Sequence, residues 1–172
     1  IARQRAKREG VEKQTTFQIM DCEALRFKDE TFDCVLDGGS FSSLDIKKAI
    51  PEIARVLKPH GTLIAIETLG HNPLTNAKRH INKMLGRRTS WAVDHIVRMD
   101  DITLIKKYFH NVRVFYFHFF SLLAFPFLSF GVGRVMLRLL EHVDHILLVI
   151  PFLQPYAFKI VIIASKLISH ND

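Results

Sequence analysis

The stretch FDCVLDGG, residues 32–39, has the composition of a short buried strand that ends in a turn. Apolar side chains occupy both faces of the strand, and two glycines follow its last residue, Asp37. A strand with one solvent-exposed face alternates apolar and polar residues, whereas a parallel strand covered by helices on both faces is largely apolar. The stretch therefore predicts a parallel sheet covered by helices.

A helix is predicted shortly after this strand. Asp45 is a plausible N-cap, and apolar residues then recur with helical spacing along one face: Ile46, Ala49, Ile50, Ile53, Ala54 and Leu57. Pro51 lies off that face and is expected to bend or restart the helix. The turn KPHG at residues 58–61 and the apolar run TLIAIE at residues 62–67 predict the next strand.

The remaining patterns extend the same alternation of strands and helices. Further strands are predicted at residues 15–20, 111–118 and 158–164, and further helices at residues 74–85, 101–109 and 132–147. On the first of these helices we expect Lys78, Arg79 and Lys83 to point outward. The order predicts an α/β fold with a doubly wound, mostly parallel sheet, an antiparallel late strand and an apolar helical insertion at residues 119–157.

Composition narrows the protein class. The chain has 172 residues, 48% of them hydrophobic, which fits one core-forming domain and excludes a disordered protein. Two cysteines exclude a disulfide-stapled scaffold and fit a reducing compartment, so we expect a cytoplasmic protein. The net charge is +7, yet only four Lys/Arg and three Asp/Glu lie after residue 113, in a segment rich in phenylalanine.

Residues 114–133 contain no Lys, Arg, Asp or Glu and are long enough to cross a bilayer. Pro126, Gly131 and a strand-like first part argue against a spanning helix. A buried core with a lid is the favoured interpretation, and a transmembrane segment and a peripheral membrane contact are the alternatives. The basic segment at residues 2–10 has no apolar region behind it and does not resemble a signal peptide.

Three motifs together carry a family resemblance. They are MDCEALRF at residues 20–27, DETFDCV at residues 29–35, and ARVLKPHG at residues 54–61, the last followed by the strand at 62–67. In this order and spacing they resemble the class I S-adenosylmethionine-dependent methyltransferases, a Rossmann-like fold, and in particular the group that acts on small molecules. His60 stands where the family usually has glycine, which histidine tolerates because it visits left-handed conformations more readily than most residues.

The resemblance implies an S-adenosylmethionine site. Asp21 would accept a hydrogen bond from the adenine amino group, the backbone N–H of Cys22 would meet a ring nitrogen, and Leu25 would pack near the ring. Asp37 and the backbone of Gly38-Gly39 would lie near the methionine part of the cofactor. The alternative for the acids is ordinary strand termination, and for Gly38-Gly39 a plain turn.

Position in the sheet supports the resemblance independently. Asp21, Asp37 and Glu67 each follow a predicted strand, and ligands of open α/β sheets bind outside the carboxyl ends of the strands. The family's glycine-rich loop and the acid that holds the ribose are absent from this sequence. We therefore expect residues 1–172 to be one domain that is N-terminally incomplete, or a truncated product that binds cofactor poorly.

Methyl transfer chiefly requires alignment of donor and acceptor, and a base only where the acceptor must lose a proton. His71 is the candidate catalytic base, with helix capping near Leu74 as the alternative. His95, His142 and His145 are weaker candidates. No metal ligand set is expected, and Cys22 and Cys34 are expected to be packing residues.

A segment rich in Phe and Leu at residues 119–157 suggests a small apolar or lipid-like acceptor, such as a lipid, a quinone or a polyprenyl-linked molecule; simple packing on the sheet is the alternative. Competing functions are another Rossmann-like nucleotide-binding enzyme, such as a nicotinamide dehydrogenase, and a non-catalytic membrane-associated remnant. The isoelectric point of about 9.6 adds nucleic-acid binding as a further alternative function. We expect no nucleic-acid partner, because the basic residues are dispersed and not interleaved with aromatic ones.

Overall fold

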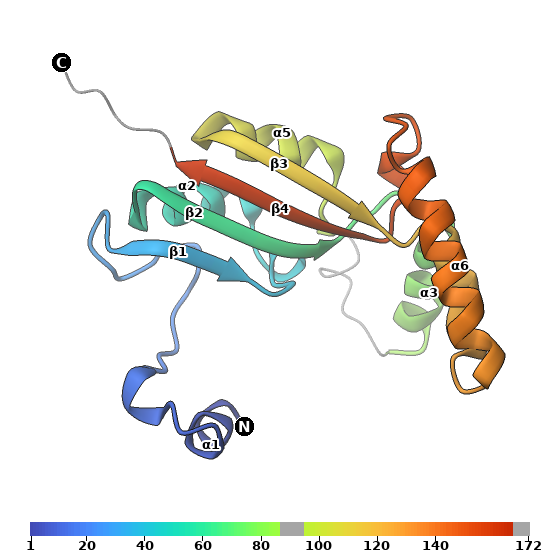
Figure 1. The fold of residues 1–172 in the computed structure, drawn as a ribbon. Coiled ribbons are helices and arrows are strands. Elements are labelled where there is room, and N and C mark those ends of the chain that lie inside the picture. The colour runs from blue at the N-terminus through green and yellow to red at the C-terminus, as the bar shows by residue number, and fades with distance from the viewer. Residues whose placement is uncertain (87–94, 167–172) are drawn as a thin grey trace.

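A computed structural model describes residues 1–86 and 95–166. Its centre is a sheet with the strand order β1-β2-β4-β3 (Figure 1). The strands are β1 (Phe32–Asp37), β2 (Leu57–Thr68), β3 (Phe109–Phe117) and β4 (Lys159–Lys166). β1 runs parallel to β2, and β4 runs antiparallel to both β2 and β3. The predicted α/β fold with an antiparallel late strand is confirmed, but the described sheet is mixed, with one parallel and two antiparallel pairs, and not mostly parallel.

Two helices cover one face of this sheet and form the core with it. They are α2 (Ile46–Val56) and α5 (Met99–Tyr108), which lie side by side behind the strands in Figure 1. Asp45 caps α2 as predicted, since its side chain accepts the Lys47 N–H at 3.1 Å. The core between the helices and the sheet contains Ile50, Leu63, Ile102, Ile105, Phe109, Ile160 and Ile162.

The opposite face of the sheet is much more open, which corrects one prediction. Leu36 is 68% exposed, and Cys34, Ile66 and Phe115 are also exposed. β1 was predicted to be covered on both faces because both carry apolar residues. An apolar pattern indicates which side chains are hydrophobic, but it does not indicate which element covers them. Among the described residues, no helical layer covers this face. Cys34 is therefore not a packing residue.

Residues 15–20 do not form the predicted strand. They run as extended chain between a 3-10 turn, η1 (Glu12–Gln14), and the loop before β1. A strand is stabilised by hydrogen bonds to a neighbour, and the described sheet offers these residues none. The short helix α1 (Ala2–Arg8) precedes them and lies apart from the sheet in Figure 1.

The KPHG turn lies within the bounds of β2 as an irregularity of its pairing with β1. Phe32 pairs with Leu57 and Cys34 pairs with Thr62, so residues 58–61 bulge out of the register. His60 has a φ of 62°, which confirms that histidine occupies a left-handed position here. A Cβ at Gly61 would lie 2.8 Å from the Lys58 carbonyl oxygen, so the bulge requires glycine at that position.

Helix α3 (Pro73–Met84) follows β2, and one of its basic residues points inward. Lys78 is exposed and Lys83 is partly exposed, but Arg79 is buried. The Arg79 guanidinium donates to Asn76 Oδ1 at 2.8 Å and to the Leu69 carbonyl at 3.4 Å. The outward prediction was wrong for Arg79 because its long side chain reaches a carbonyl just beyond the end of β2.

Between β3 and β4 lies a largely helical segment. It contains η3 (Phe120–Phe127), α6 (Gly131–Leu147) and η4 (Gln154–Tyr156), and α6 lies beyond the end of the strands (Figure 1). Residues 114–133 are divided among β3, η3, a loop and the start of α6, so they form no single helix. Within the described ranges, no helix is long and apolar enough to cross a membrane.

A buried carboxylate joins the parts of this insertion. Asp144 of α6 accepts the backbone N–H groups of Phe119 at 2.8 Å, Phe120 at 2.7 Å and Ser121 at 3.0 Å. α6 also approaches η3 closely, because a Cβ at Gly133 would collide with the Phe127 carbonyl. Backbone donors at the start of a helical turn lack internal partners, so Asp144 satisfies groups that would otherwise be buried and unpaired.

Replacing Asp144 tests this anchor. We expect Asp144→Ala to lower the free energy of unfolding by about 2–3 kcal/mol, since it removes charge-assisted bonds to buried donors. Glu141→Ala, on the exposed side of the same helix, should change it by less than about 0.5 kcal/mol. Urea unfolding of both variants measures the difference, and equal losses would contradict the anchoring role.

Candidate functional site

Two acids lie at the carboxyl edge of the sheet, as the sequence predicts. Asp37 ends β1 and Glu67 lies one residue before the end of β2, and both are buried. Asp37 accepts the N–H groups of Gly39 and Ser40, each at 3.1 Å, and the Ser40 hydroxyl. Glu67 accepts the Phe41 N–H at 2.7 Å. The structure thus brings the two acids and the Gly38-Gly39 turn together.

The two carboxyl groups also bond to each other. Burial, and after it the hydrogen bond with Asp37, raise the pKa of Glu67 to about 8 against the opposing effect of the Phe41 N–H. Glu67 therefore carries a proton at neutral pH and donates it toward Asp37. Sequence reasoning noted the position of Glu67 but gave it no role, because the contact depends on the pairing of β1 with β2.

The segment that carries Asp21, Cys22 and Leu25 lies along α2. Near the start of α2, Glu23 Oε1 accepts the Asp45 N–H at 2.7 Å. Near its end, the Leu25 N–H donates to Glu52 Oε2 at 2.9 Å. Asp45 follows the loop that begins at Asp37, so the segment and the two buried acids are connected through the first turn of α2.

Asp21 forms a local turn. Its Oδ1 accepts the Glu23 N–H at 2.9 Å, and its Oδ2 has no hydrogen-bond donor within residues 1–86 and 95–166. A cavity of about 320 Å³ has the neighbouring Met20 in its wall, together with Thr16, Gln18, Leu25, Phe27 and Phe32. A mostly apolar hollow with an acceptor oxygen one residue further along the chain suits a flat heterocycle that carries an amino group.

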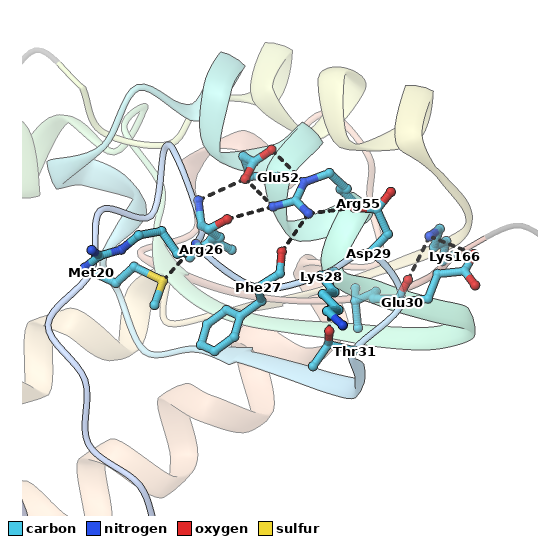
Figure 2. Close-up of polar contacts among 12 residues, drawn as sticks. Met20, Arg26, Phe27, Lys28, Asp29, Glu30, Thr31, Glu52, Arg55 and Lys166 are labelled. Atoms are coloured by element: carbon cyan, nitrogen blue, oxygen red, sulfur yellow. Dashed lines mark hydrogen bonds and ion pairs between the residues drawn. The ribbon is translucent and has the colours of Figure 1, made fainter.

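Arg55 of α2 clamps this segment in place, as Figure 2 shows. Its guanidinium bonds to Glu52 at 2.8 and 2.9 Å and to Asp29 at 2.7 Å. It also donates to the carbonyls of Leu25 and Phe27, each at 2.8 Å. The Arg55 hydrogen bond lowers the pKa of Glu52, and the two carboxylates raise that of Arg55. The ARVLKPHG motif contains Arg55, but only the fold reveals what it holds.

His71, the predicted base, lies in the loop after β2. Its Nε2 accepts the Met99 N–H at 3.3 Å, at the first residue of α5. Burial, followed by the positive charge of Arg98, lowers the pKa of His71, so the ring is neutral at pH 7. The capping residue of α3 is its neighbour Asn72, whose Oδ1 accepts the Leu74 and Thr75 N–H groups. The geometry therefore favours a structural role for His71, although at α5 and not at α3.

The other histidine candidates lie elsewhere. His95 lines a separate cavity of about 370 Å³ between the start of α2 and the start of α5. His142 and His145 are exposed on α6, and His142 Nδ1 lies 2.8 Å from the Arg138 carbonyl of its own helix. In the part of the chain that the structure describes, no group of three His, Cys, Asp or Glu is placed to hold a metal.

A larger cavity opens beside the end of β2. Its volume is about 600 Å³, and Thr68, the residue after Glu67, lines it. The walls come from α3, η3 and the start of β4: Leu74, Thr75, Lys78, Arg79, Asn82, Leu122, Phe125, Pro126 and Phe158. One wall is therefore apolar, and the other carries amide, hydroxyl and cationic groups. Cavities at this edge of an open α/β sheet are the usual ligand sites.

Comparison with known proteins identifies the fold. Geranyl diphosphate C-methyltransferase from Streptomyces coelicolor A3(2) superposes with a TM-score of 0.56 over 95% of this chain and 58% of its own, at 13% identity. The cyclase SpnF superposes with a TM-score of 0.58 over 98% of this chain and 62% of its own, at 18% identity. The chain has the class I methyltransferase fold.

Sequence comparison agrees with this methyltransferase fold. Residues 1–65 match the family model described as a methyltransferase domain. A ubiquinone/menaquinone biosynthesis C-methyltransferase, UbiE, of Hydrogenovibrio crunogenus is 38% identical over 68 residues, which are 39% of this chain and 27% of that protein. The chain thus aligns with only about a quarter of the length of the curated relatives it matches. The predicted fold class is confirmed, and the sequence matches are to methyltransferases.

The buried proton of Glu67 predicts a pH dependence of stability. The pKa of Glu67 is higher in the folded chain than in the unfolded chain, so its contribution is complete below the unfolded value of 4.5 and is lost as the pH rises through about 8. Glu67→Gln keeps a hydrogen-bond donor toward Asp37 and cannot ionise, so the loss of stability between these two pH values should disappear in this variant.

Urea unfolding at about pH 5 and about pH 9 measures the effect, which should be a few kcal/mol in the unmodified protein. Glu23→Gln is the control, because that carboxylate is less buried, and it should keep the original dependence. If Glu67→Gln shows the same slope as the unmodified chain, the buried proton is not at Glu67.

The Arg55 clamp predicts local protection of the segment that carries Asp21 and Leu25. In Arg55→Gln, the Leu25 N–H should exchange with solvent at least about tenfold faster, because the segment then opens more often. Lys58→Gln removes an exposed ion pair with Asp33 and should leave that exchange unchanged. Hydrogen exchange of both variants decides the matter; similar rates in the two would argue against the clamp.

Proposed function

We propose that this chain belongs to an enzyme that transfers a methyl group from S-adenosylmethionine to a small apolar acceptor. The observation that carries the proposal is the half-apolar cavity at the carboxyl end of β2, next to Glu67, in a methyltransferase fold. The named activities of the relatives support it. Fold alone does not, because the cyclase SpnF shares it.

The residues near Asp21 suit the adenosine part of the cofactor. Asp21 Oδ2 would accept a hydrogen bond from an adenine amino group, and Leu25 would pack on the ring in the cavity of about 320 Å³. Glu52 and Arg55 position Leu25 and touch no ligand in this proposal. The cofactor would supply an electrophilic methyl group on sulfur.

The loop after β1 suits the methionine part. The Asp37 carboxylate is occupied by its own turn, so the backbone of Gly38-Gly39 would meet the ligand. Apart from its chain neighbours, no atom of residues 1–86 and 95–166 lies within 4 Å of the place where a Gly38 Cβ would stand, which leaves room for a close approach. Glu67 holds this turn through Asp37 and Phe41 and is a positioning residue.

The acceptor would occupy the larger cavity. Leu122, Phe125 and Phe158 would exclude water from it, and exclusion of water with alignment is what this transfer needs. This supports residues 119–157 as a lid. The relative named for ubiquinone/menaquinone biosynthesis and the neighbour named for geranyl diphosphate both point to acceptors with an apolar chain. An acceptor of this kind partitions into membranes. The predictions of a cytoplasmic protein and of its peripheral contact with a membrane are therefore kept together in this proposal.

A base enters only for an acceptor that must lose a proton. His71 remains the predicted base for that case, since its ring is neutral at pH 7. Its hydrogen bond from Met99 would have to break before it could act, which favours the structural role.

Calorimetry with S-adenosylhomocysteine on the intact protein tests the proposal. We expect binding, and we expect Asp21→Ala to weaken it by about tenfold or more, because a charge-assisted hydrogen bond is lost. Asp33→Ala, at an exposed acid paired with Lys58, is the matched control and should bind normally. Absence of binding by the unmodified protein would overturn the proposed function.

A further inference from the structure

Helix α6 exposes an apolar stripe that the rest of the chain leaves bare. Its inward side packs on η3 and carries the buried residues Gly133 and Asp144. A second side carries Val132, Val135, Leu139, Val143 and Ile146, here called the α6 stripe. These residues are 42–71% exposed and recur with the spacing of one helix face. A helix of 17 residues extends this stripe over about 25 Å.

The loops at the two ends of α6 continue the apolar surface. Phe127, Leu128 and Phe130 precede the helix, and Val149, Ile150 and Phe152 follow it. All six side chains are exposed, with Phe130 at 62% and Phe152 at 75%. α6 lies on the outside of the molecule, beyond the end of the sheet (Figure 1). Exposed apolar residues gathered on one helix and on the segments that flank it mark an interaction site on a folded chain.

Charge indicates the kind of partner. The third side of α6 carries Arg134, Arg138, His142 and His145, with Glu141 as the single exposed acid of the helix. The other acid of α6, Asp144, is buried and bonded to three backbone N–H groups. An apolar stripe bordered by cations, with Phe at its ends, is the arrangement of helices that lie in the surface of an anionic bilayer.

The surface is also connected to the larger cavity. Leu122, Phe125 and Pro126 of η3 line that cavity, and the next residues along the chain are the exposed loop before α6. A bilayer in contact with the loop would therefore lie close to the apolar wall. This connection rests on the proposed function, whereas the surface itself does not.

We propose that the α6 stripe and its two flanking loops dock on an anionic lipid bilayer, with α6 parallel to the membrane surface. The stripe and the phenylalanines enter the boundary between headgroups and acyl chains. Arg134 and Arg138 remain at the level of the phosphates. An apolar acceptor dissolved in the bilayer then reaches the cavity along η3 without crossing water.

Flotation of the intact protein with vesicles tests the docking. Vesicles of phosphatidylcholine with phosphatidylglycerol should bind the unmodified protein, and phosphatidylcholine alone should bind it more weakly. Leu139→Glu should weaken binding about tenfold or more, because the side chain no longer enters the apolar layer. Ile19→Glu is the matched control, since it makes the same change at an exposed apolar residue away from α6, and it should bind like the unmodified protein.

Removing the cations tests the second half of the proposal. Arg134→Gln/Arg138→Gln should weaken binding to the anionic vesicles by roughly fivefold for each arginine and reduce its dependence on salt, while leaving the weak binding to phosphatidylcholine unchanged. The replaced side chains are exposed, so circular dichroism should show the fold intact in every variant.

Three outcomes would overturn the docking: no vesicle binding by the unmodified protein, equal binding by Leu139→Glu and Ile19→Glu, or a self-association in light scattering that Leu139→Glu abolishes without any vesicle binding. The last result would assign the stripe to a second copy of the chain. Calorimetry with S-adenosylhomocysteine on the same samples separates the two proposals. Cofactor binding without vesicle binding refutes only the docking, and the reverse refutes only the proposed function.

Discussion

A proton held between Glu67 and Asp37 joins the carboxyl ends of the two parallel neighbours β1 and β2. Without it, two carboxylates would face each other in a buried place, which the low dielectric makes unfavourable. With it, Glu67 fixes the Phe41 N–H and Asp37 fixes the turn at Gly39 and Ser40. The loop that leads to α2 therefore has one defined path, and the position of α2 follows from it.

The rest of the candidate site depends on α2. Between η1 and β1 the chain forms no helix or strand, so its backbone groups need partners from elsewhere. Near the end of α2, Glu52 and Arg55 provide partners for the backbone of Leu25 and Phe27. Near its start, the Glu23 side chain accepts the Asp45 N–H and ties the segment to the helix a second time. An irregular segment thereby acquires a fixed place beside the sheet. Side chains of one helix thus supply the hydrogen bonds that a neighbouring strand supplies elsewhere in the fold.

Prediction from the sequence succeeded where the pattern was local. β1 and the Asp45 cap follow from apolar spacing and the chemistry of one side chain. The strand predicted at residues 15–20 is absent because a strand requires a hydrogen-bonded neighbour, which local composition does not provide. The prediction that Arg79 points outward was wrong because its side chain reaches a carbonyl near the end of β2. The prediction that Cys34 is a packing residue was wrong because an apolar strand face does not show whether a helix covers it. For the site, Asp21, Cys22 and Leu25 came from family resemblance, whereas the roles of Glu52, Arg55 and Glu67 require contacts that only the fold creates.

The strand order has a consequence for the time course of folding. β4, the last strand described, lies between β2 and β3, so both of its edges pair with residues made earlier. Until residues 159–166 are synthesised, β2 and β3 have no bond to each other, and their facing edges carry unpaired N–H and C=O groups. Pairings between residues so distant along the chain form slowly, and open edges invite pairing with other chains. The centre of this sheet therefore closes only once residues 159–166 are available, after the residues of the other three strands have been made.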